Sequence, residues 1–111
     1  MAYPRKVNLI AKTLEDHKGE DIEILNVRNL TPFADYYVIA TAPNTRALGA
    51  LADHVDETLL TEKDPVRQIE GKPESEWVIV DCGEVIVHLF TEEKRFEISL
   101  DQLIKKANAK K

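Results

Sequence analysis

The sequence predicts one domain of the α/β (α+β) class, with a mixed sheet of about five strands and helices packed against it. Three observations support this prediction. The 111 residues suffice for one hydrophobic core but not for two. Amphipathic helical stretches alternate with short apolar, β-branched stretches. Two of these apolar stretches flank a tight turn, which indicates antiparallel pairing, whereas a helix between two others suits a right-handed parallel crossover.

The first two elements are a helix and an irregular strand. Apolar residues recur at helical spacing from Val7 to Leu14. Lys18 and Gly19 end this helix, and we expect Gly19 to take the left-handed conformation that often follows a last helical turn. Residues 21–27 alternate like a strand, with a slip of phase in the middle.

A central strand and a second helix follow. Residues 36–41 are mostly aromatic or β-branched and carry no charge, which predicts a strand covered on both faces. Asn44 or Thr45 is the expected N-cap of the next helix, and Asp64 and Pro65 end it. The apolar stripe of this helix consists of Leu48, Leu51, Ala52, Val55 and Leu59.

The second half of the chain contributes three strands. Residues 66–70 predict a short edge strand, since Pro65 precedes them and proline is confined to sheet edges. Residues 77–82 and 85–90 are strong strand runs around Gly83. Their close spacing predicts an antiparallel hairpin.

The C-terminal part predicts a polar turn at residues 91–94 and a last helix. Ser99 to Gln102 has the pattern of a capping box. The expected apolar stripe of the last helix is Leu100, Leu103, Ile104 and Ala107. We expect residues 1–104 to form the domain and residues 105–111 to be a basic, disordered tail.

Charge is distributed unevenly along the chain. Residues 105–111 hold four of the 15 Lys and Arg, so residues 1–104 carry 11 Lys or Arg against 20 Asp or Glu, a net charge of −9. Phosphate backbones bind cationic side chains, so we expect no direct sequence-specific binding of nucleic acid. A partner with basic side chains fits this body better.

Several classes of protein do not fit the sequence. Apolar runs such as residues 85–87 are far too short to cross a bilayer, and no signal peptide is visible after Met1. Cys82 is the single cysteine, which rules out an intrachain disulfide. We therefore expect a cytoplasmic protein that is not attached to a membrane.

No catalytic or metal-binding pattern stands out, and we expect neither a cofactor nor a metal. No Cys pair, HExxH or P-loop occurs. His88 is either a hydrogen-bonded core histidine or a catalytic base, and we favour the first because no nucleophile lies at a useful spacing. Asp35 and Asp81 at strand ends could hold magnesium, but Asp81 also suits a tight turn, which we favour.

Two residues near the hairpin, Cys82 and Trp77, can each be interpreted in two ways. Cys82 has no neighbouring cation in the sequence to activate its thiol, so we interpret it as a passive residue. Trp77 begins a strand after a polar loop. It is either a core residue or a surface anchor of the kind that dominates protein interfaces.

The most specific motif is WVIVDCGEVIVH at residues 77–88. Residues 34–41, residues 52–55, Glu70-Gly71 and residues 92–95 match further motifs in the same order. This order resembles the ribosomal silencing factor, or Iojap-like, family of bacteria and organelles. The resemblance covers about residues 9–103.

The resemblance implies a fold related to nucleotidyltransferases that lacks their catalytic Gly-Ser pair and metal-binding acids, and so no enzyme activity. It also implies a homodimer that binds protein fourteen of the large ribosomal subunit at the intersubunit face. Bound there, the factor would prevent the small subunit from joining and so repress translation when nutrients are limiting.

The resemblance also implies which residues touch the partner. Family members usually have a larger apolar residue at the position of Cys82, and many have aromatic residues at those of Ile98 and Ile104, so this sequence departs from the family at these positions. The implied surface consists of Trp77, Asp81, Cys82, Gly83 and Glu84, with Glu70 and Arg95 nearby.

Two alternative functions remain open at this point. The first is a magnesium-dependent, nucleotidyltransferase-like enzyme that uses Asp35 or Asp81, and magnesium-dependent nucleotide binding would distinguish it. The second is a dimeric adaptor for some other basic protein, which a pull-down lacking ribosomal proteins would favour.

Overall fold

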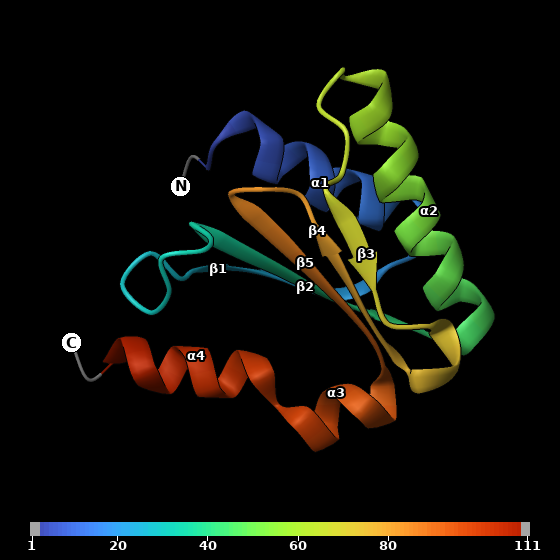
Figure 1. Cartoon of the computed structure of the whole chain (residues 1–111). Helices are drawn as coiled ribbons and strands as arrows, with labels where there is room; N and C mark the ends of the chain where they lie inside the picture. The colour runs from blue at the N-terminus through green and yellow to red at the C-terminus, as the bar shows by residue number, and fades with distance from the viewer. Residues whose placement is uncertain (1–2, 110–111) are drawn as a thin grey trace.

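The structure is a computed structural model that describes residues 3–109. It forms two helical layers around one sheet (Figure 1). Its elements in chain order are α1 (Arg5–Asp16), β1 (Glu20–Asn26), β2 (Tyr36–Ala42), α2 (Thr45–Thr61), β3 (Gln68–Glu70), the 3₁₀ helix η1 (Pro73–Ser75), β4 (Trp77–Asp81), β5 (Val85–Thr91), α3 (Glu92–Ile98) and α4 (Leu100–Ala109).

The five strands form one mixed sheet in the order β1-β2-β5-β4-β3. The pair β2–β5 is parallel and the other three pairs are antiparallel. This arrangement confirms the predicted sheet and hairpin. The crossover from β2 through α2 reaches β3 at the far edge, so α2 packs on β2, β5 and β4.

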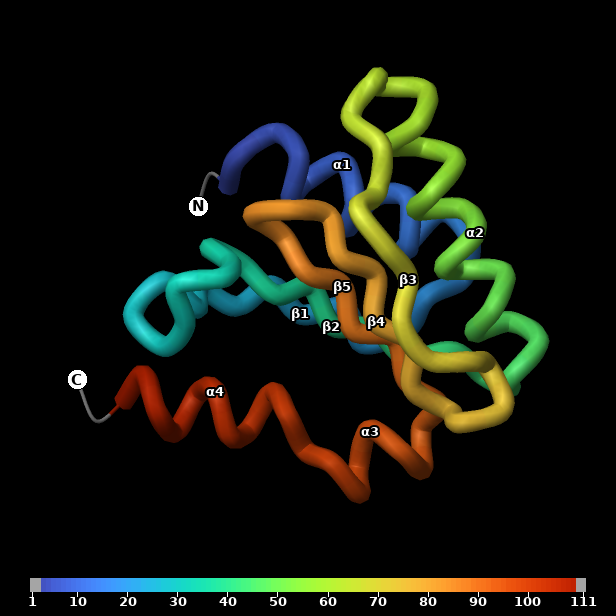
Figure 2. Tube along the Cα trace, viewed as in Figure 1, coloured from blue at the N-terminus to red at the C-terminus, as the bar shows by residue number. Residues whose placement is uncertain are grey.

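Helices cover the two faces of the sheet unequally. Helices α1 and α2 lie together on one face, and α3 and α4 run along the other (Figures 1 and 2). Helix α4 packs against β1, and α3 packs against β5 and β2. On the face that α3 and α4 cover, strands β4 and β3 are therefore less covered by helices. Within residues 3–109, no helix is long and apolar enough to cross a membrane.

Two hydrophobic clusters form the core. The larger one lies between the sheet and helices α1 and α2. The smaller one lies between the sheet and helices α3 and α4, and it contains Leu25, Val27, Ala34, Ile39, Phe90 and Ile104. Strand β2 contributes to both clusters, which confirms the prediction that it is covered on both faces.

Local chemistry explains where α2 begins and how β1 bends. The Asn44 side chain accepts a hydrogen bond from the Ala47 N–H at 2.8 Å, so Asn44 is the N-cap. The phase slip of β1 is a register shift between Glu20 and Glu23, with Asp21 at φ +47°.

The predicted role of Gly19 is wrong. Lys18, and not Gly19, takes the left-handed conformation after α1, with φ +70°. The Gly19 N–H donates to the Leu14 carbonyl at 2.7 Å, and a Cβ at this position would lie only 2.8 Å from that oxygen. Glycine is therefore needed for close approach of the backbone and not for its φ.

The predicted polar turn at residues 91–94 is also wrong, because these residues begin α3. Thr91 is the N-cap, and its hydroxyl accepts from the Lys94 N–H at 3.3 Å. Ser99 does not form a capping box, since it lies in the left-handed region at φ +51° and donates to the Phe96 carbonyl at 2.6 Å. A single residue thus separates α3 from α4.

The last helix extends further than the sequence indicates. Residues 105–109 belong to α4, so they are not the disordered tail that we expected, and residues 110–111 lie outside the described residues. Lys105 pairs with Glu23 at 2.6 Å. Leu103, expected in the apolar stripe, is 59% exposed, whereas Ile104 is buried.

Arg95 fastens the C-terminal helices to the sheet. Its Nη1 donates to the Asp21 carbonyl at 2.6 Å and to Thr41 Oγ1 at 2.8 Å. Its Nη2 lies 3.5 Å from Glu23 Oε2 and 3.6 Å from Asp101 Oδ2. The side chain is only 12% exposed. One guanidinium therefore joins α3 and α4 to the β1 bulge and to β2.

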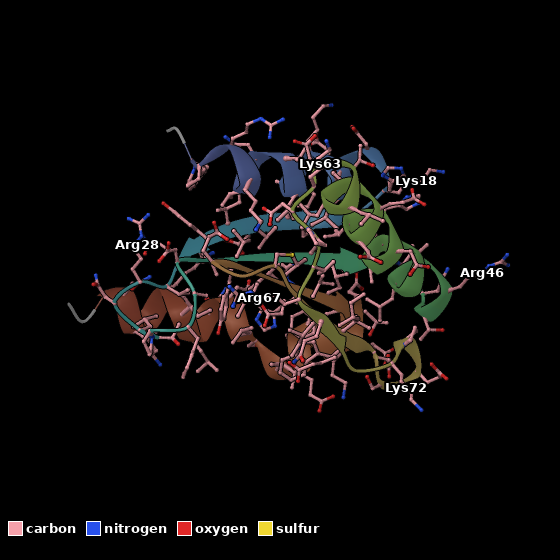
Figure 3. The ribbon with its side chains drawn as sticks, turned by 45° about the horizontal axis from the view of Figure 1, so that its top comes forward. Lys18, Arg28, Arg46, Lys63, Arg67 and Lys72 are labelled. Atoms are coloured by element: carbon pink, nitrogen blue, oxygen red, sulfur yellow. The ribbon has the colours of Figure 1, made fainter. Side chains whose placement is uncertain are left out.

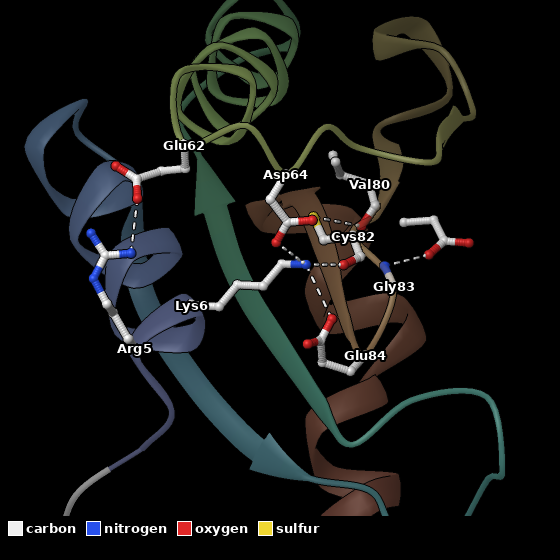
Figure 4. A network of polar contacts seen from close by, with 9 residues as sticks. Arg5, Lys6, Glu62, Asp64, Val80, Cys82, Gly83 and Glu84 are labelled. Carbon is white, nitrogen blue, oxygen red and sulfur yellow. Dashed lines mark hydrogen bonds and ion pairs between the residues drawn. The ribbon is translucent and has the colours of Figure 1, made fainter.

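Lys6 fastens α1 to the hairpin in a comparable way (Figure 4). Its Nζ donates to the Cys82 carbonyl at 2.6 Å and lies 2.8 Å from Asp64 and 3.1 Å from Glu84. Burial alone would lower the Lys6 pKa, but the hydrogen bonds to the two carboxylates raise it above its ordinary value. The charged form is thus held between three elements.

Replacing Arg95 should destabilise the fold. We expect Arg95→Met to lower the free energy of unfolding by about 2 kcal/mol or more, because it leaves the buried Thr41 and Asp101 without their donor. Arg5→Met is the control, since its ion pair with Glu62 is exposed and should contribute less than about 1 kcal/mol. Urea unfolding measures both, and equal effects would contradict the role of Arg95.

Lys6 gives a second test of the same kind. Lys6→Met keeps the aliphatic stem but removes the ammonium, so we expect a loss of about 1–3 kcal/mol in the free energy of unfolding. Lys12→Met removes a surface pair with Asp16 and should change stability by about 0.5 kcal/mol or less. A Lys6 variant as stable as the Lys12 variant would show that the network in Figure 4 contributes little.

Candidate functional site

A hollow of about 310 Å³ lies where the β3–β4 edge meets α3. Trp77 and Ile79 of β4 contribute apolar surface, and Ile98 of α3 faces them. Glu70 and Lys94 add one charge of each sign. The hollow therefore combines apolar walls with charged groups, as ligand and partner sites commonly do.

The alternation of side chains along β4 shows which residues share a surface with this hollow. Trp77, Ile79 and Asp81 alternate along β4 and so point to the same face of the sheet, and all three are half-buried. Glu70 pairs with Ile79 in the register of β3 and β4, so it shares that face and is exposed. We call the surface formed by Glu70, Trp77, Ile79 and Asp81 the Trp77 face.

The Trp77 ring is held in a defined position. Its Nε1–H donates to His88 Nδ1 at 3.2 Å, and its ring centroid lies 5.1 Å from that of Phe90. The backbone is fixed as well, since Ser75 Oγ donates to the Trp77 carbonyl at 3.0 Å. Trp77 is thus partly core and partly surface, which reconciles the two interpretations of the sequence.

Gly71 allows the chain to approach this tryptophan. It has φ +85°, and a Cβ added there would lie 2.5 Å from the Trp77 carbonyl oxygen. A larger residue would therefore be both strained and in collision with β4. Gly71 therefore lets the chain after β3 pass close to β4, with Glu70 at the rim of the hollow.

His88 is a buried, neutral core histidine, as we favoured from the sequence. It is 6% exposed, and burial lowers its pKa to about 4. Because Nδ1 accepts the indole hydrogen bond, the ring proton of the neutral form sits on Nε2. That Nε2 is buried without a hydrogen-bond partner among residues 3–109. The Tyr37 ring lies 4.5 Å away.

Cys82 is passive, as interpreted from the sequence, but its side chain does not lie on the surface that the resemblance implies. Its side chain is 2% exposed and belongs to the cluster beneath α1 and α2, on the opposite side of the sheet from the Trp77 face. Burial raises the pKa of its thiol to about 12. The thiol therefore contributes to the core and is out of reach of a partner.

Asp81 and Gly83 form the turn that the sequence favoured for them. Asp81 Oδ1 accepts from the Gly83 N–H at 2.9 Å, and Gly83 has φ +89°. The other strand-end acid, Asp35, lies 3.7 Å from Arg28. Among residues 3–109, no group of three or more His, Cys, Asp or Glu side chains is arranged to hold a metal ion.

Glu84 and Arg95 do not lie on the Trp77 face. Glu84 pairs with Lys6 on the α1 side, and hydrogen bonds from its own backbone N–H and from Lys6 lower its pKa. Arg95 points from α3 toward Asp21 and Thr41, away from the hollow. Of the seven residues expected in one surface, the structure brings together Trp77, Asp81 and Glu70.

Sequence reasoning missed three contributors to this region: Ile79, Ile98 and His88 as the partner of Trp77. The alternation of β4 is a signal that could have identified Ile79. Ile98 was noted only as a departure from the family, and it lines the hollow. The other such position, Ile104, is buried in the smaller core cluster.

The pH dependence of stability tests the environment of His88. Its pKa is about 4 when folded and about 6.5 as the ordinary value, so the unfolded chain binds more protons between these values. The free energy of unfolding therefore rises with pH in this window. As the pH falls from neutral to 4, we expect His88 to lower it by on the order of 3 kcal/mol.

His88→Phe is the control for this measurement, because it removes the titrating group and keeps a ring. Urea unfolding at several pH values should show a shallower decline for the variant than for the unmodified protein. Parallel pH profiles would contradict the assignment of a buried neutral histidine.

Comparison with known proteins shows relatives over most of the chain. The family model described as "Ribosomal silencing factor during starvation" matches residues 1–111, so the lysine-rich end is included. A ribosomal silencing factor of Zymomonas mobilis is 30% identical over 97 residues, which cover 87% of this chain and 73% of that protein. A Mus musculus protein named mitochondrial assembly of ribosomal large subunit protein 1 is 29% identical and covers 87% of this chain, which spans 44% of its length.

The fold is shared with a solved relative as well. A crystal structure of a Chromobacterium violaceum protein superposes with a TM-score of 0.88 at 31% identity, covering 95% of this chain and 88% of that one. Sequence and fold thus agree over nearly the whole chain. The protein belongs to the ribosomal silencing factor family.

Proposed function

We propose that this protein binds the large ribosomal subunit through the Trp77 face and, by occupying that position, keeps the small subunit from joining. The partner in this proposal is protein fourteen of the large subunit, and the result is repression of translation when nutrients are limiting. The observation that carries the proposal is a half-buried tryptophan at the rim of a hollow, on the part of the sheet that α3 and α4 leave least covered.

The Trp77 face has the composition of a protein-binding surface. Its centre is apolar, with Trp77 and Ile79, and tryptophan is the residue most enriched in interface hot spots. Its edge carries the carboxylates of Glu70 and Asp81, which can complement a basic partner. These features support a contact with a protein partner.

The charge of the molecule also favours a basic protein over RNA. Six Lys and Arg side chains lie on separate segments and are spread around the molecule (Figure 3). The two least exposed cations of the ion pairs, Lys6 and Arg95, are engaged within the fold. The cations labelled in Figure 3 are not gathered into the concentrated basic patch that phosphate binding requires.

The proposed mechanism requires occupancy and not catalysis. Asp81 is used in a turn and Asp35 pairs with Arg28, so both acids of the enzyme alternative have structural roles. The homodimer and the cytoplasmic location belong to this proposal through the family resemblance. A calorimetric titration with magnesium and nucleotide that shows binding would favour the enzyme alternative instead.

Truncating the tryptophan should weaken binding to the large subunit. We expect Trp77→Ala to reduce the affinity by about 2 kcal/mol or more, roughly thirtyfold, because the variant loses its apolar anchor. Co-sedimentation with isolated large subunits measures the effect. Phe33→Ala is the matched control, since Phe33 is 82% exposed in the β1–β2 loop, away from the Trp77 face.

A charge reversal gives a second test, which does not depend on whether Trp77→Ala folds. Glu70 is exposed, so Glu70→Lys should leave the fold intact and still weaken binding to a basic partner. Unchanged sedimentation of both Trp77→Ala and Glu70→Lys would rule out the Trp77 face as the binding surface.

A further inference from the structure

We propose that His88 is the positioning residue that makes Trp77 an apolar-only anchor, so that the partner meets the indole with an apolar group and not with a hydrogen-bond acceptor. This inference rests on the proposed function of the Trp77 face. It adds a residue that lies beneath that face and specifies the chemistry of the contact.

The tryptophan side chain has a single polar atom. The indole Nε1–H can only donate, and it usually finds a partner in a folded protein. In this protein it donates to His88 Nδ1 at 3.2 Å. An acceptor on the partner would have to compete with this internal bond. The remaining surface of the ring is apolar.

His88 is held in place by neighbouring strands and rings. It lies opposite Ile79 in β4 and opposite Ile39 in β2, in the middle of the sheet. Its ring is 6.3 Å from that of Phe90 and 4.5 Å from that of Tyr37. The surroundings are aromatic and aliphatic, and burial keeps the imidazole neutral at physiological pH. It therefore remains an acceptor at Nδ1.

The surroundings of Trp77 specify the chemistry of the partner. With the indole donor engaged, Trp77, Ile79 and Ile98 form the apolar walls of the hollow of about 310 Å³, whose lining also includes Glu70 and Lys94. Polar recognition falls to the edge, where Glu70 is exposed. The chemistry that fits is an apolar side chain, or the aliphatic stem of a long one, flanked by basic groups. A partner surface that presented a carbonyl or carboxylate to the indole would not fit.

Three variants test this inference together. His88→Phe keeps a ring but removes the acceptor. His88→Asn places an amide oxygen near the position of Nδ1 and can restore it. Trp77→Phe removes the donor and keeps an aromatic ring. The chain has a single tryptophan, so one indole N–H signal in a ¹⁵N-labelled sample reports directly on the internal bond.

The expected results separate positioning from mere packing. His88→Phe should expose the indole N–H to solvent exchange and weaken co-sedimentation with large subunits about tenfold. His88→Asn should keep the N–H protected and bind within about threefold of the unmodified protein. The double variant Trp77→Phe/His88→Phe should bind no more weakly than Trp77→Phe alone, since the two changes remove the same bond.

Several results would overturn the inference. An indole N–H that exchanges freely in the unmodified protein removes the positioning role. Unchanged binding by a folded His88→Phe variant removes it too, while leaving the proposed function intact. His88→Leu replaces the phenylalanine variant if circular dichroism shows that the latter does not fold. Failure of the unmodified protein to sediment with large subunits contradicts the proposed function and the partner chemistry, whereas the N–H signal still decides whether His88 positions Trp77.

Discussion

The parallel pairing of β2 with β5 is the contact on which the rest of the structure depends. It joins the N-terminal half of the chain to the hairpin, in continuous register from Tyr36 opposite Val85 to Ala42 opposite Thr91. Parallel strands have to be covered on both faces, and both strands are almost entirely buried. Helices are therefore required above and below this pair, and the strands added outside it need less cover.

This requirement explains why the functional candidate lies where it does. Helices α1 and α2 complete the upper layer, with Lys6 as one of its ties to the hairpin. Helices α3 and α4 cover the lower face of β1, β2 and β5, and Arg95 holds them against the β1 bulge. Strand β4 is left with one covered face and one half-buried face, as its alternating burial shows. An interface can use such a face without disturbing the core.

Particular residues show how far the sequence predicts this structure. The spacing of apolar residues and the chemistry of turn residues identified the strands, the Asn44 cap and the Asp81-Gly83 turn, because these depend on neighbouring residues alone. Thr91 was misjudged because a threonine followed by two glutamates suits a polar turn as well as a helix start.

The site was harder to predict, because adjacent residues in a strand point to opposite faces. Trp77 and Cys82 were placed in one surface through the family resemblance, yet an odd separation within β4 and its turn puts the cysteine under α1 and α2. The contact of Trp77 with His88 depends on the hairpin register, in which Trp77 faces Phe90 and Ile79 faces His88. That register follows from where the turn closes, and one residue of slip would send His88 to the opposite face.

The internal ion pairs also shape how the protein can meet a ribonucleoprotein particle. Lys6, Arg95 and Lys105 each contact carboxylates of the same chain, so part of the positive charge is paired within the molecule. Glu70 and Asp81, the acids of the Trp77 face, take part in none of the ion pairs of the described residues, and Glu70 stays exposed. An acidic surface is repelled by phosphate and attracted by basic side chains at the same distance. In the proposed function, this charge pattern would direct the Trp77 face toward a basic protein and not toward RNA, and the apolar centre around Trp77 would supply the short-range fit.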